Sequence, residues 1–290
     1  MARIFVALPV SGGYYPEMIS SMFKLFLENP GGHTFVPHPM SDESLISRAR
    51  SKLASFFLDT DCDFLLSIDA DMEFPVDAVD RLVRHDKDIV AAPYPVKTTP
   101  TRWAVAFNGA APTYVEGLLP VRYVSTGFSL VKRRVVEALC TPDLRYYEAE
   151  EARHHYAIYL PLLHESETGS RLYLSEDYAF CQRAKDKGYE IFCDFDIRLR
   201  HWGKNPYEML EINGKLPSHP VMPFVSELQD MVTMTESLSQ PNPAASLPQN
   251  YAQMMQTMMD SFAEVGNMLK NLATAPPTTH SEDSVSSGQT

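Results

Sequence analysis

The sequence predicts an α/β protein with a mixed, mostly parallel sheet flanked by helices, a smaller antiparallel part and a low-complexity C-terminal tail. Three observations carry this prediction. Strand-like and helix-like segments alternate from residue 3 to about residue 200. A buried strand, DFLLSI, ends at a cluster of three acids, Asp69, Asp71 and Glu73. Around residue 230 the composition changes to Ser, Thr, Pro, Gln and Met.

The composition narrows the class of protein. The 290 residues suffice for one large domain or two small ones, and 44% of them are hydrophobic and 21% charged, as in globular proteins. The net charge of -12 argues against nonspecific binding to nucleic acid or to an anionic membrane. Four scattered cysteines indicate free thiols in a reducing compartment. The start MARIFVALPV resembles a core strand more than a signal peptide, so we expect a cytoplasmic protein without a membrane anchor.

In the first third of the chain, each element follows from its apolar pattern. RIFVALPV is a continuous apolar run that ends at a Pro/Gly-rich turn, as in a buried strand. Apolar residues at helical spacing predict a helix from Glu17 to Leu27, and HTFVPH predicts a short extended segment. The next helix, with Leu45 and Leu53 on its buried face, is expected to be capped by Ser41 or Asp42. After DFLLSI, a helix with Pro75 in its first turn is expected.

Further along, glycines and prolines divide the chain into short elements. DIVAAPYP, RWAVAFN and residues 112–133 predict strands, of which the later ones are expected to be antiparallel. VVEAL and SEDYAFCQRAKDKG predict helices, and YEIFCDFDI predicts a strand. His154, His155 and His164 lack zinc-site spacing, and we expect them in a loop on the acceptor side.

The change in composition predicts two regions, a folded domain over residues 1–230 and a tail over residues 231–290. Residues 251–273 have apolar side chains at helical spacing, including Met254, Phe262 and Leu269. This segment is either part of a largely disordered tail or an amphipathic helix that self-associates or docks a partner.

Asp69 and Asp71 follow a strand directly, so both carboxylates are expected to face a shared space at its carboxyl end. Like charges so close together cost free energy unless positive charge lies among them, and carboxylate oxygens suit Mg²⁺ or Mn²⁺. A D-x-D alone also fits a solvated turn. Two later features favour the metal: Glu176 and Asp177 begin a helix, and His201 follows a predicted strand and could supply a nitrogen ligand.

Taken in order, these features resemble the GT-A fold (Rossmann-like) nucleotide-sugar glycosyltransferases, especially their family-2-like group. The matching segments span about residues 3–210 and are ALPV, Asp69-Ala70-Asp71, Ser125-Thr126-Gly127-Phe128, Ser175-Glu176-Asp177 and His201. Each motif is weak alone, and the order of all five is fairly specific.

The resemblance implies a metal-dependent transfer of a sugar from a nucleoside diphosphate sugar, with a UDP-sugar favoured, to a hydroxyl acceptor. It implies that Asp71, and Asp69 beside it, hold the ion, with Asp69 also contacting the ribose. His201 would complete the metal shell, and an imidazole ligand favours Mn²⁺ over Mg²⁺. Asp177 would act as the general base of an inverting reaction, with Glu176 orienting the acceptor or the base.

The donor site follows from the same resemblance. Gly127 would let the backbone pass close to the donor or acceptor. Either Arg48 or Arg50 would meet the nucleotide, because residues two apart on a helix point in different directions. Pro9 and Val10 would line the base pocket. Lys97 and Arg102 are available to phosphate, although a solvated loop explains them equally well.

Each of these site residues also has a purely structural explanation. Glu176 and Asp177 also fit first-turn acids of a helix, His201 also fits a packed aromatic pair with Trp202, and Gly127 also fits a bulge. Two other functions use the same features: a nucleotidyltransferase that attacks phosphorus, and a non-catalytic binding protein stabilised by a cation. The acceptor could be a glycan, a protein, a small molecule or a hydroxylated base in phage DNA.

Overall fold

The computed structural model describes residues 1–41, 43–98, 102–108, 113–166, 169–203 and 206–208. The chain divides into two units, Met1–Met222 and Pro223–Thr290, and every described residue belongs to the first. The predicted tail at residues 231–290 and its helix at 251–273 therefore lie outside the described residues. Within the described part, no helix has both the length and the apolar character needed to cross a membrane.

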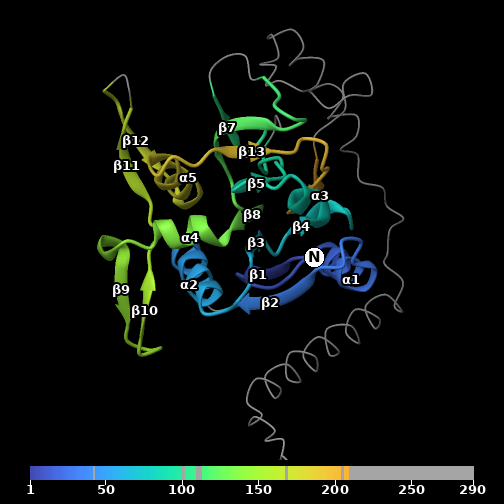
Figure 1. Ribbon diagram of the computed structural model, residues 1–290, viewed down its shortest axis with the longest axis horizontal. Coiled ribbons are helices and arrows are strands. Elements are labelled where there is room, and N and C mark those ends of the chain that lie inside the picture. The colour runs from blue at the N-terminus through green and yellow to red at the C-terminus, as the bar shows by residue number, and fades with distance from the viewer. Residues whose placement is uncertain (42, 99–101, 109–112, 167–168, 204–205, 209–290) are drawn as a thin grey trace, which may run out of the picture. The chain divides into compact units, whose positions relative to one another are not determined.

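A central sheet of eight strands organises the described unit (Figure 1), in the order β2-β1-β3-β8-β5-β13-β7-β6. Its strands, in chain order, are β1 (Arg3–Pro9), β2 (Thr34–Met40), β3 (Phe64–Ile68), β5 (Ile89–Ala91), β6 (Val105–Phe107), β7 (Leu119–Val124), β8 (Phe128–Lys132) and β13 (Ile191–Cys193). β8 and β7 oppose the other six strands, which share one direction. The mixed sheet with mostly parallel strands is the GT-A-like α/β arrangement that the sequence predicts.

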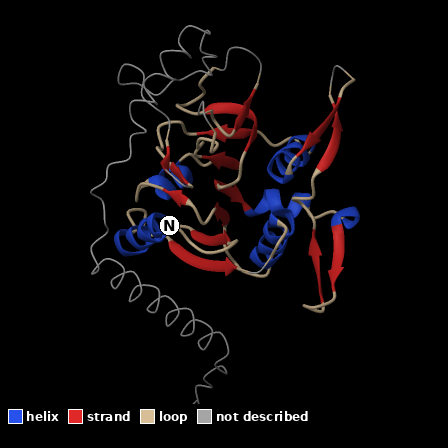
Figure 2. Cartoon of the chain, turned by 180° about the vertical axis from the view of Figure 1, so that it is seen from behind, coloured by secondary structure: helices blue, strands red, loops and turns tan. Residues whose placement is uncertain are grey.

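Helices cover both faces of this sheet (Figures 1 and 2). They are α1 (Pro16–Glu28), α2 (Ile46–Leu58), α3 (Ala78–Arg84), α4 (Arg133–Leu139) and α5 (Glu176–Asp186), with a short 3-10 helix η1 (Pro142–Leu144). One core cluster joins the sheet to α2, α4 and α5, and a second joins it to α1 and α3. The sequence of β1 is apolar throughout because both of its faces are buried. Ile4 and Val6 lie in the second cluster, and Phe5 and Ala7 lie in the first.

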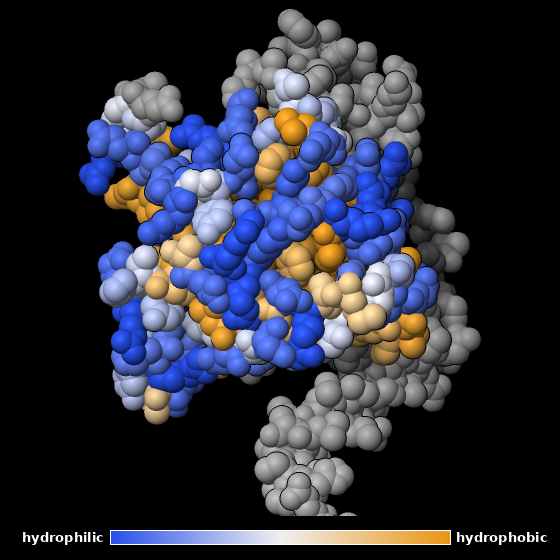
Figure 3. Space-filling model, in the orientation of Figure 1, coloured by the Kyte–Doolittle hydropathy of each residue, from blue (hydrophilic) through white to orange (hydrophobic). Residues whose placement is uncertain are grey.

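Three small sheets complete the described part. They are formed by β9 (Arg145–Glu148) with β10 (Arg153–Tyr156), by β11 (Leu162–Glu165) with β12 (Arg171–Leu174), and by β4 (Met72–Glu73) with β14 (Arg200–Trp202) and β15 (Pro206–Tyr207). The two hairpins lie outside the layer of α2, α4 and α5 (Figure 2). The surface seen in Figure 3 is mostly hydrophilic and carries separate apolar patches.

Three local predictions are wrong. Leu45 is the N-cap of α2, so neither Ser41 nor Asp42 caps it. α3 begins at Ala78 rather than at Pro75, because Met72 and Glu73 pair with β14 and a turn follows them. His154, His155 and His164 lie in strands of the two hairpins rather than in a loop, where cross-strand pairing fixes them.

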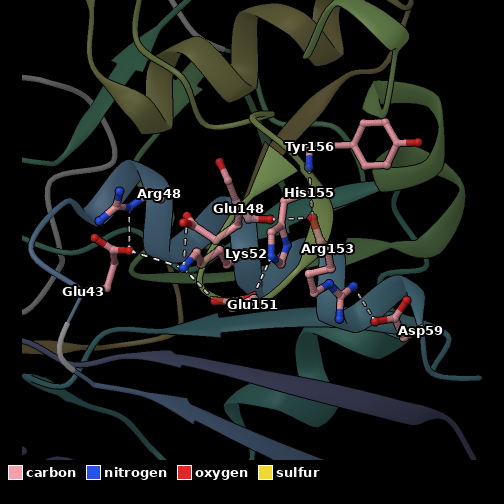
Figure 4. Close-up of polar contacts among 11 residues, drawn as sticks. Glu43, Arg48, Lys52, Asp59, Glu148, Glu151, Arg153, His155 and Tyr156 are labelled. Carbon is pink, nitrogen blue, oxygen red and sulfur yellow. Dashed lines mark hydrogen bonds and ion pairs between the residues drawn. The ribbon is translucent and has the colours of Figure 1, made fainter. Parts of the chain in front are cut away.

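Polar contacts attach the β9–β10 hairpin to α2 (Figure 4). Lys52 Nζ on α2 lies 2.7 Å from Glu151 Oε1, and His155 Nε2 lies 2.7 Å from Glu151 Oε2. The backbone amide of Tyr156 donates to Ser55 Oγ at 3.1 Å. Because His155 and Lys52 are buried, these contacts also satisfy polar groups that lie away from water.

Candidate active site

The acids of the D-x-D lie in the turn between β3 and β4, where backbone bonds from three distant segments hold them. Asp69 N donates to Gly127 O at 2.9 Å, Tyr15 N donates to Ala70 O at 2.9 Å, and Trp202 N donates to Asp71 O at 2.8 Å. The turn is therefore fixed by the start of α1, by the β7–β8 connection and by β14. Such a fixed backbone positions both carboxylates at the carboxyl end of β3, as the sequence predicts.

Three positively charged side chains pair with the three neighbouring acids Asp69, Asp71 and Glu73. Arg50 Nη2 donates to both carboxylate oxygens of Asp69, at 2.8 and 3.1 Å. Lys97 Nζ lies 2.5 Å from Asp71 Oδ2. Arg200 Nη1 lies 3.2 Å from Glu73 Oε1, and Trp202 Nε1 donates to Glu73 Oε2 at 2.8 Å. Each acid thus has its own cation, and Glu73 fastens β4 to β14.

His201 lies beside Asp71 because β14 pairs with β4, with His201 opposite Met72. Its Nδ1 lies 2.9 Å from the carbonyl oxygen of Pro95, which can only accept, so Nδ1 carries the hydrogen. Its Nε2 lies 3.4 Å from Asp71 Oδ2. Burial alone would raise the pKa of Asp71, but the contacts with His201 and Lys97 outweigh burial and lower that pKa.

These two side chains fit a divalent ion. A carboxylate oxygen and an imidazole nitrogen face the same space, and the Nδ1 hydrogen bond fixes the imidazole as it does in metal-ligating histidines. Asp69 is instead occupied by Arg50. No group of three or more His, Cys, Asp or Glu side chains within the described ranges is arranged to hold a metal. Asp71 and His201 would therefore share the ion with oxygens of a bound ligand.

Arg50 is the centre of a second cluster, which joins the D-x-D to α5. It is only 5% exposed, and its Nε lies 3.5 Å from Asp177 Oδ1. Burial opposes its charge, but the carboxylates of Asp69 and Asp177 outweigh burial and raise the pKa of Arg50. Burial, with the charges of Asp177 and Asp71, raises the pKa of Asp69 despite the ion pair with Arg50. Within the described residues, Nε and Nη1 of Arg50 are buried without hydrogen-bond partners.

The two acids of α5 differ in their surroundings. Asp177 is buried and accepts a short hydrogen bond from the Thr126 hydroxyl, next to Gly127. Glu176 is half-buried, and burial, followed by the charge of Asp177, raises its pKa. β12 of the β11–β12 hairpin ends two residues before α5, so this hairpin is connected directly to the turn of helix that carries the two acids. Sequence reasoning missed Thr126 as a partner of Asp177, although it named the loop that contains it.

Gly127 lies in the tightest part of the cluster. A Cβ atom there would lie 2.5 Å from Tyr94 Oη and 2.6 Å from Asp69 Oδ2, closer than real Cβ atoms approach their neighbours. Its amide donates to Tyr94 Oη at 3.3 Å. A side chain at this position would therefore require Tyr94 or Asp69 to move. Tyr94 itself has no counterpart in the predicted site, because a lone tyrosine after a strand gives no signal in the sequence.

Of the remaining predicted site residues, Pro9 and Val10 lie at the end of β1 and Arg48 lies in the first turn of α2. Pro9 ends β1, and Val10 N donates to Met40 O at 2.9 Å, at the same edge of the sheet as Asp69. Arg48 pairs instead with Glu43 at 2.6 Å (Figure 4). It lines a pocket of about 390 Å³ between the start of α2 and β9. Of the two arginines, Arg50 therefore reaches the acids and Arg48 does not.

Comparisons with known proteins find similar solved structures but no matching family. No protein-family model matches the sequence, and no curated protein matches it. Among solved structures, it is similar to A197 from STIV, with 17% identity, 70% of this chain and 86% of that chain covered, and a TM-score of 0.45.

Two further solved structures are similar to about two thirds of this chain. S. aureus TarS is 13% identical, with 68% of this chain and 35% of that chain covered and a TM-score of 0.36. A CMP:2-keto-3-deoxy-manno-octonic acid synthetase complexed with CTP is 11% identical, with 67% and 89% covered and a TM-score of 0.33. All three TM-scores are below 0.5, so the case for a function rests on the geometry of the chain itself.

Proposed function

We propose that this protein is a metal-dependent glycosyltransferase that moves a sugar from a nucleoside diphosphate sugar, with a UDP-sugar favoured, to a hydroxyl acceptor. The observation that carries the proposal is the convergence of two clusters at the carboxyl edge of the sheet. Asp71 with His201 forms one, and Asp69, Arg50 and Asp177 form the other.

The first cluster suits the leaving group. Asp71 and His201 would hold Mn²⁺, or Mg²⁺, which when bound stabilises the negative charge that develops on the departing diphosphate. Asp69 is assigned to the ribose of the donor, and its carboxylate is oriented by Arg50. Pro9 and Val10, at the end of β1, are assigned to the base, and Gly127 leaves room for Tyr94 and for the Asp69 carboxylate that is assigned to the ribose.

The second cluster suits the acceptor. Asp177 would accept the proton from the acceptor hydroxyl as that oxygen bonds to the anomeric carbon and the bond to the nucleoside diphosphate breaks, a direct displacement that inverts the anomeric carbon. The Thr126 hydroxyl and Arg50 Nε both face Oδ1 of Asp177, and no hydrogen bond to Oδ2 is present among the described residues. Glu176, adjacent on α5, would orient the acceptor. Arg50 therefore links the donor acid to the base through one buried guanidinium.

Donor hydrolysis tests this proposal. The full chain is mixed with a panel of nucleotide sugars, with and without Mn²⁺, beside Asp71→Asn and the control Asp77→Asn, an exposed carboxylate near the start of α3. We expect metal-dependent release of a nucleoside diphosphate from one donor, lost in Asp71→Asn and kept in Asp77→Asn. Pyrophosphate release from a nucleoside triphosphate would instead identify a nucleotidyltransferase. Failure of UDP and CTP to bind with Mn²⁺ would leave only a cation-stabilised structural role.

A further inference from the structure

Lys97 contacts the same carboxylate oxygen that His201 faces. Its Nζ lies 2.5 Å from Asp71 Oδ2, and His201 Nε2 lies 3.4 Å from that oxygen. Neither the D-x-D pattern nor the proposed ligand set accounts for this ammonium group. Asp71 Oδ2 therefore has two partners, the positively charged ammonium group of Lys97 and an imidazole nitrogen of His201 that suits a metal ion.

The backbone that carries Lys97 is tied to His201. The His201 ring donates from Nδ1 to the carbonyl of Pro95, two residues before Lys97. Pro95 pairs with Trp103, and Val96 N donates to Arg102 O at 2.9 Å. The base of the lysine is therefore fixed beside the imidazole, whatever its ammonium contacts.

The side chain of Lys97, in contrast, has room to turn. It is 32% exposed, its stem passes over Gly203, and its Nζ lies 5.9 Å from the centroid of the Tyr15 ring. A Cβ at Gly203 would lie 3.3 Å from Lys97 Cδ, so that glycine leaves space for the stem. A lysine stem with four methylene groups can carry its ammonium between alternative oxygens around a fixed backbone.

A divalent ion and an ammonium group repel one another, and the repulsion is strong at the distance set by one shared oxygen. We propose that Lys97 is a built-in cation that competes with the divalent ion for Asp71. Once the ion displaces it, Lys97 turns its charge to the diphosphate of the donor. This inference rests on the proposed function and deepens it, because it assigns a residue that couples metal binding to donor binding at that site.

Mn²⁺ binding tests the competition directly. The signal of free Mn²⁺ in electron paramagnetic resonance is titrated with the full-length chain as wild type, Lys97→Met and Lys97→Gln. Lys87→Met is the matched control, since Lys87 is also partly exposed and pairs with one acid, Glu116, at 2.6 Å. We expect both Lys97 variants to bind Mn²⁺ about tenfold or more tightly than wild type, which corresponds to the loss of one adjacent positive charge. Lys87→Met should match wild type.

A second titration tests the role at the diphosphate. With Mn²⁺ saturating, Lys97→Met should bind UDP several-fold more weakly than wild type, because it lacks the charge that would turn to the phosphates. Asp71→Asn, added to either background, should abolish the Mn²⁺ effect and so assign it to this carboxylate. Equal or weaker Mn²⁺ binding in Lys97→Met overturns the competition while leaving the glycosyltransferase proposal standing. Absence of both Mn²⁺ and UDP binding in every variant overturns the two together.

Discussion

His201 Nε2 and Asp71 Oδ2 lie 3.4 Å apart, although the two residues are far apart in the sequence. The pairing of β14 with β4 produces this proximity, and Trp202 N, which donates to Asp71 O, reinforces it. A structural pair of aromatic residues at a strand end would not require the imidazole nitrogen to face a carboxylate. The relationship therefore supports a shared ligand for the two side chains.

The first prediction concerns this pair. His201→Asn should weaken Mn²⁺ binding by about 10- to 100-fold, since it removes one of two protein ligands. His154→Asn, a change at an exposed histidine of β10, should leave Mn²⁺ binding unchanged. Isothermal titration calorimetry with the full chain measures both. Equal Mn²⁺ affinities in the two variants would show that His201 is not a ligand.

The second prediction compares two arginines on one helix. Arg50→Met leaves the half-buried Asp69 and the buried Asp177 without their cation, so it should lower the free energy of unfolding by about 3–5 kcal/mol. Arg48→Met removes a partly exposed arginine, and Glu43 keeps Lys52 Nζ at 3.8 Å and the Leu45 amide at 3.2 Å as partners, so this change should cost at most about 1 kcal/mol. Urea denaturation of both variants gives the difference. A small cost for Arg50→Met would mean that water reaches this cluster and screens its charges.

The third prediction concerns the space at Gly127. Gly127→Ala should lower stability by about 1–3 kcal/mol and abolish donor hydrolysis, because the added methyl group displaces Tyr94 or Asp69. Gly203→Ala is the control, because a Cβ there meets only the ring of Tyr207 at 3.2 Å and the stem of Lys97. Its stability should change less. Thermal unfolding and the hydrolysis assay together test whether the space at Gly127 is needed for the reaction.

The fourth prediction separates the two acids of α5. Asp177→Asn should reduce kcat by about 10²–10⁴-fold with little change in donor affinity, as expected for loss of a general base. Glu176→Gln should mainly raise the KM for the acceptor. Steady-state kinetics with the identified acceptor measure this split. A larger loss of kcat in Glu176→Gln would assign proton transfer to Glu176 and leave Asp177 as the partner of Arg50.

The fifth prediction concerns pH and His155. Burial is the largest cause that lowers the pKa of His155 from 6.5, and the hydrogen bond with Glu151 opposes it only in part. As pH falls through 6.5, the unfolded chain takes up a proton that the folded chain does not, so the free energy of unfolding decreases. His155→Gln removes this titration and should flatten the decrease. Urea denaturation at several pH values between about 5.5 and 7.5 measures it, and parallel curves would contradict the assignment.

The central sheet was predictable because its signals are local. An apolar run such as RIFVALPV must be buried on both faces, and helical spacing marks α1 and α5 over several turns. The D-x-D was placed correctly at the end of β3 for the same reason, since a strand fixes the direction of the residues that follow it.

The small sheets and the cations of the site were not predictable in the same way. β4 has two residues, and its pairing depends on β14, which lies far away in sequence. The β9–β10 hairpin carries Tyr, Glu and His, whose pattern does not distinguish a strand from a loop. Lys97 and Arg50 reach their acids through tertiary packing alone, so spacing could not show which acid each one neutralises.

The small sheet of β4, β14 and β15 also affects how tightly the site made by Asp71 and His201 can bind a ligand. β14 contacts β4 through two residue pairs, so its detachment costs far less than unfolding of the eight-stranded sheet. When it detaches, His201 leaves and the backbone bond from Trp202 N to Asp71 O breaks, while the bonds of Asp69 N and Ala70 O still hold the turn that carries Asp71. Apparent affinity for a ligand held by both residues therefore scales with the fraction of molecules in which this strand is docked. Variants that loosen β14, such as a change at Glu73 or Trp202, would weaken binding without touching a ligand residue.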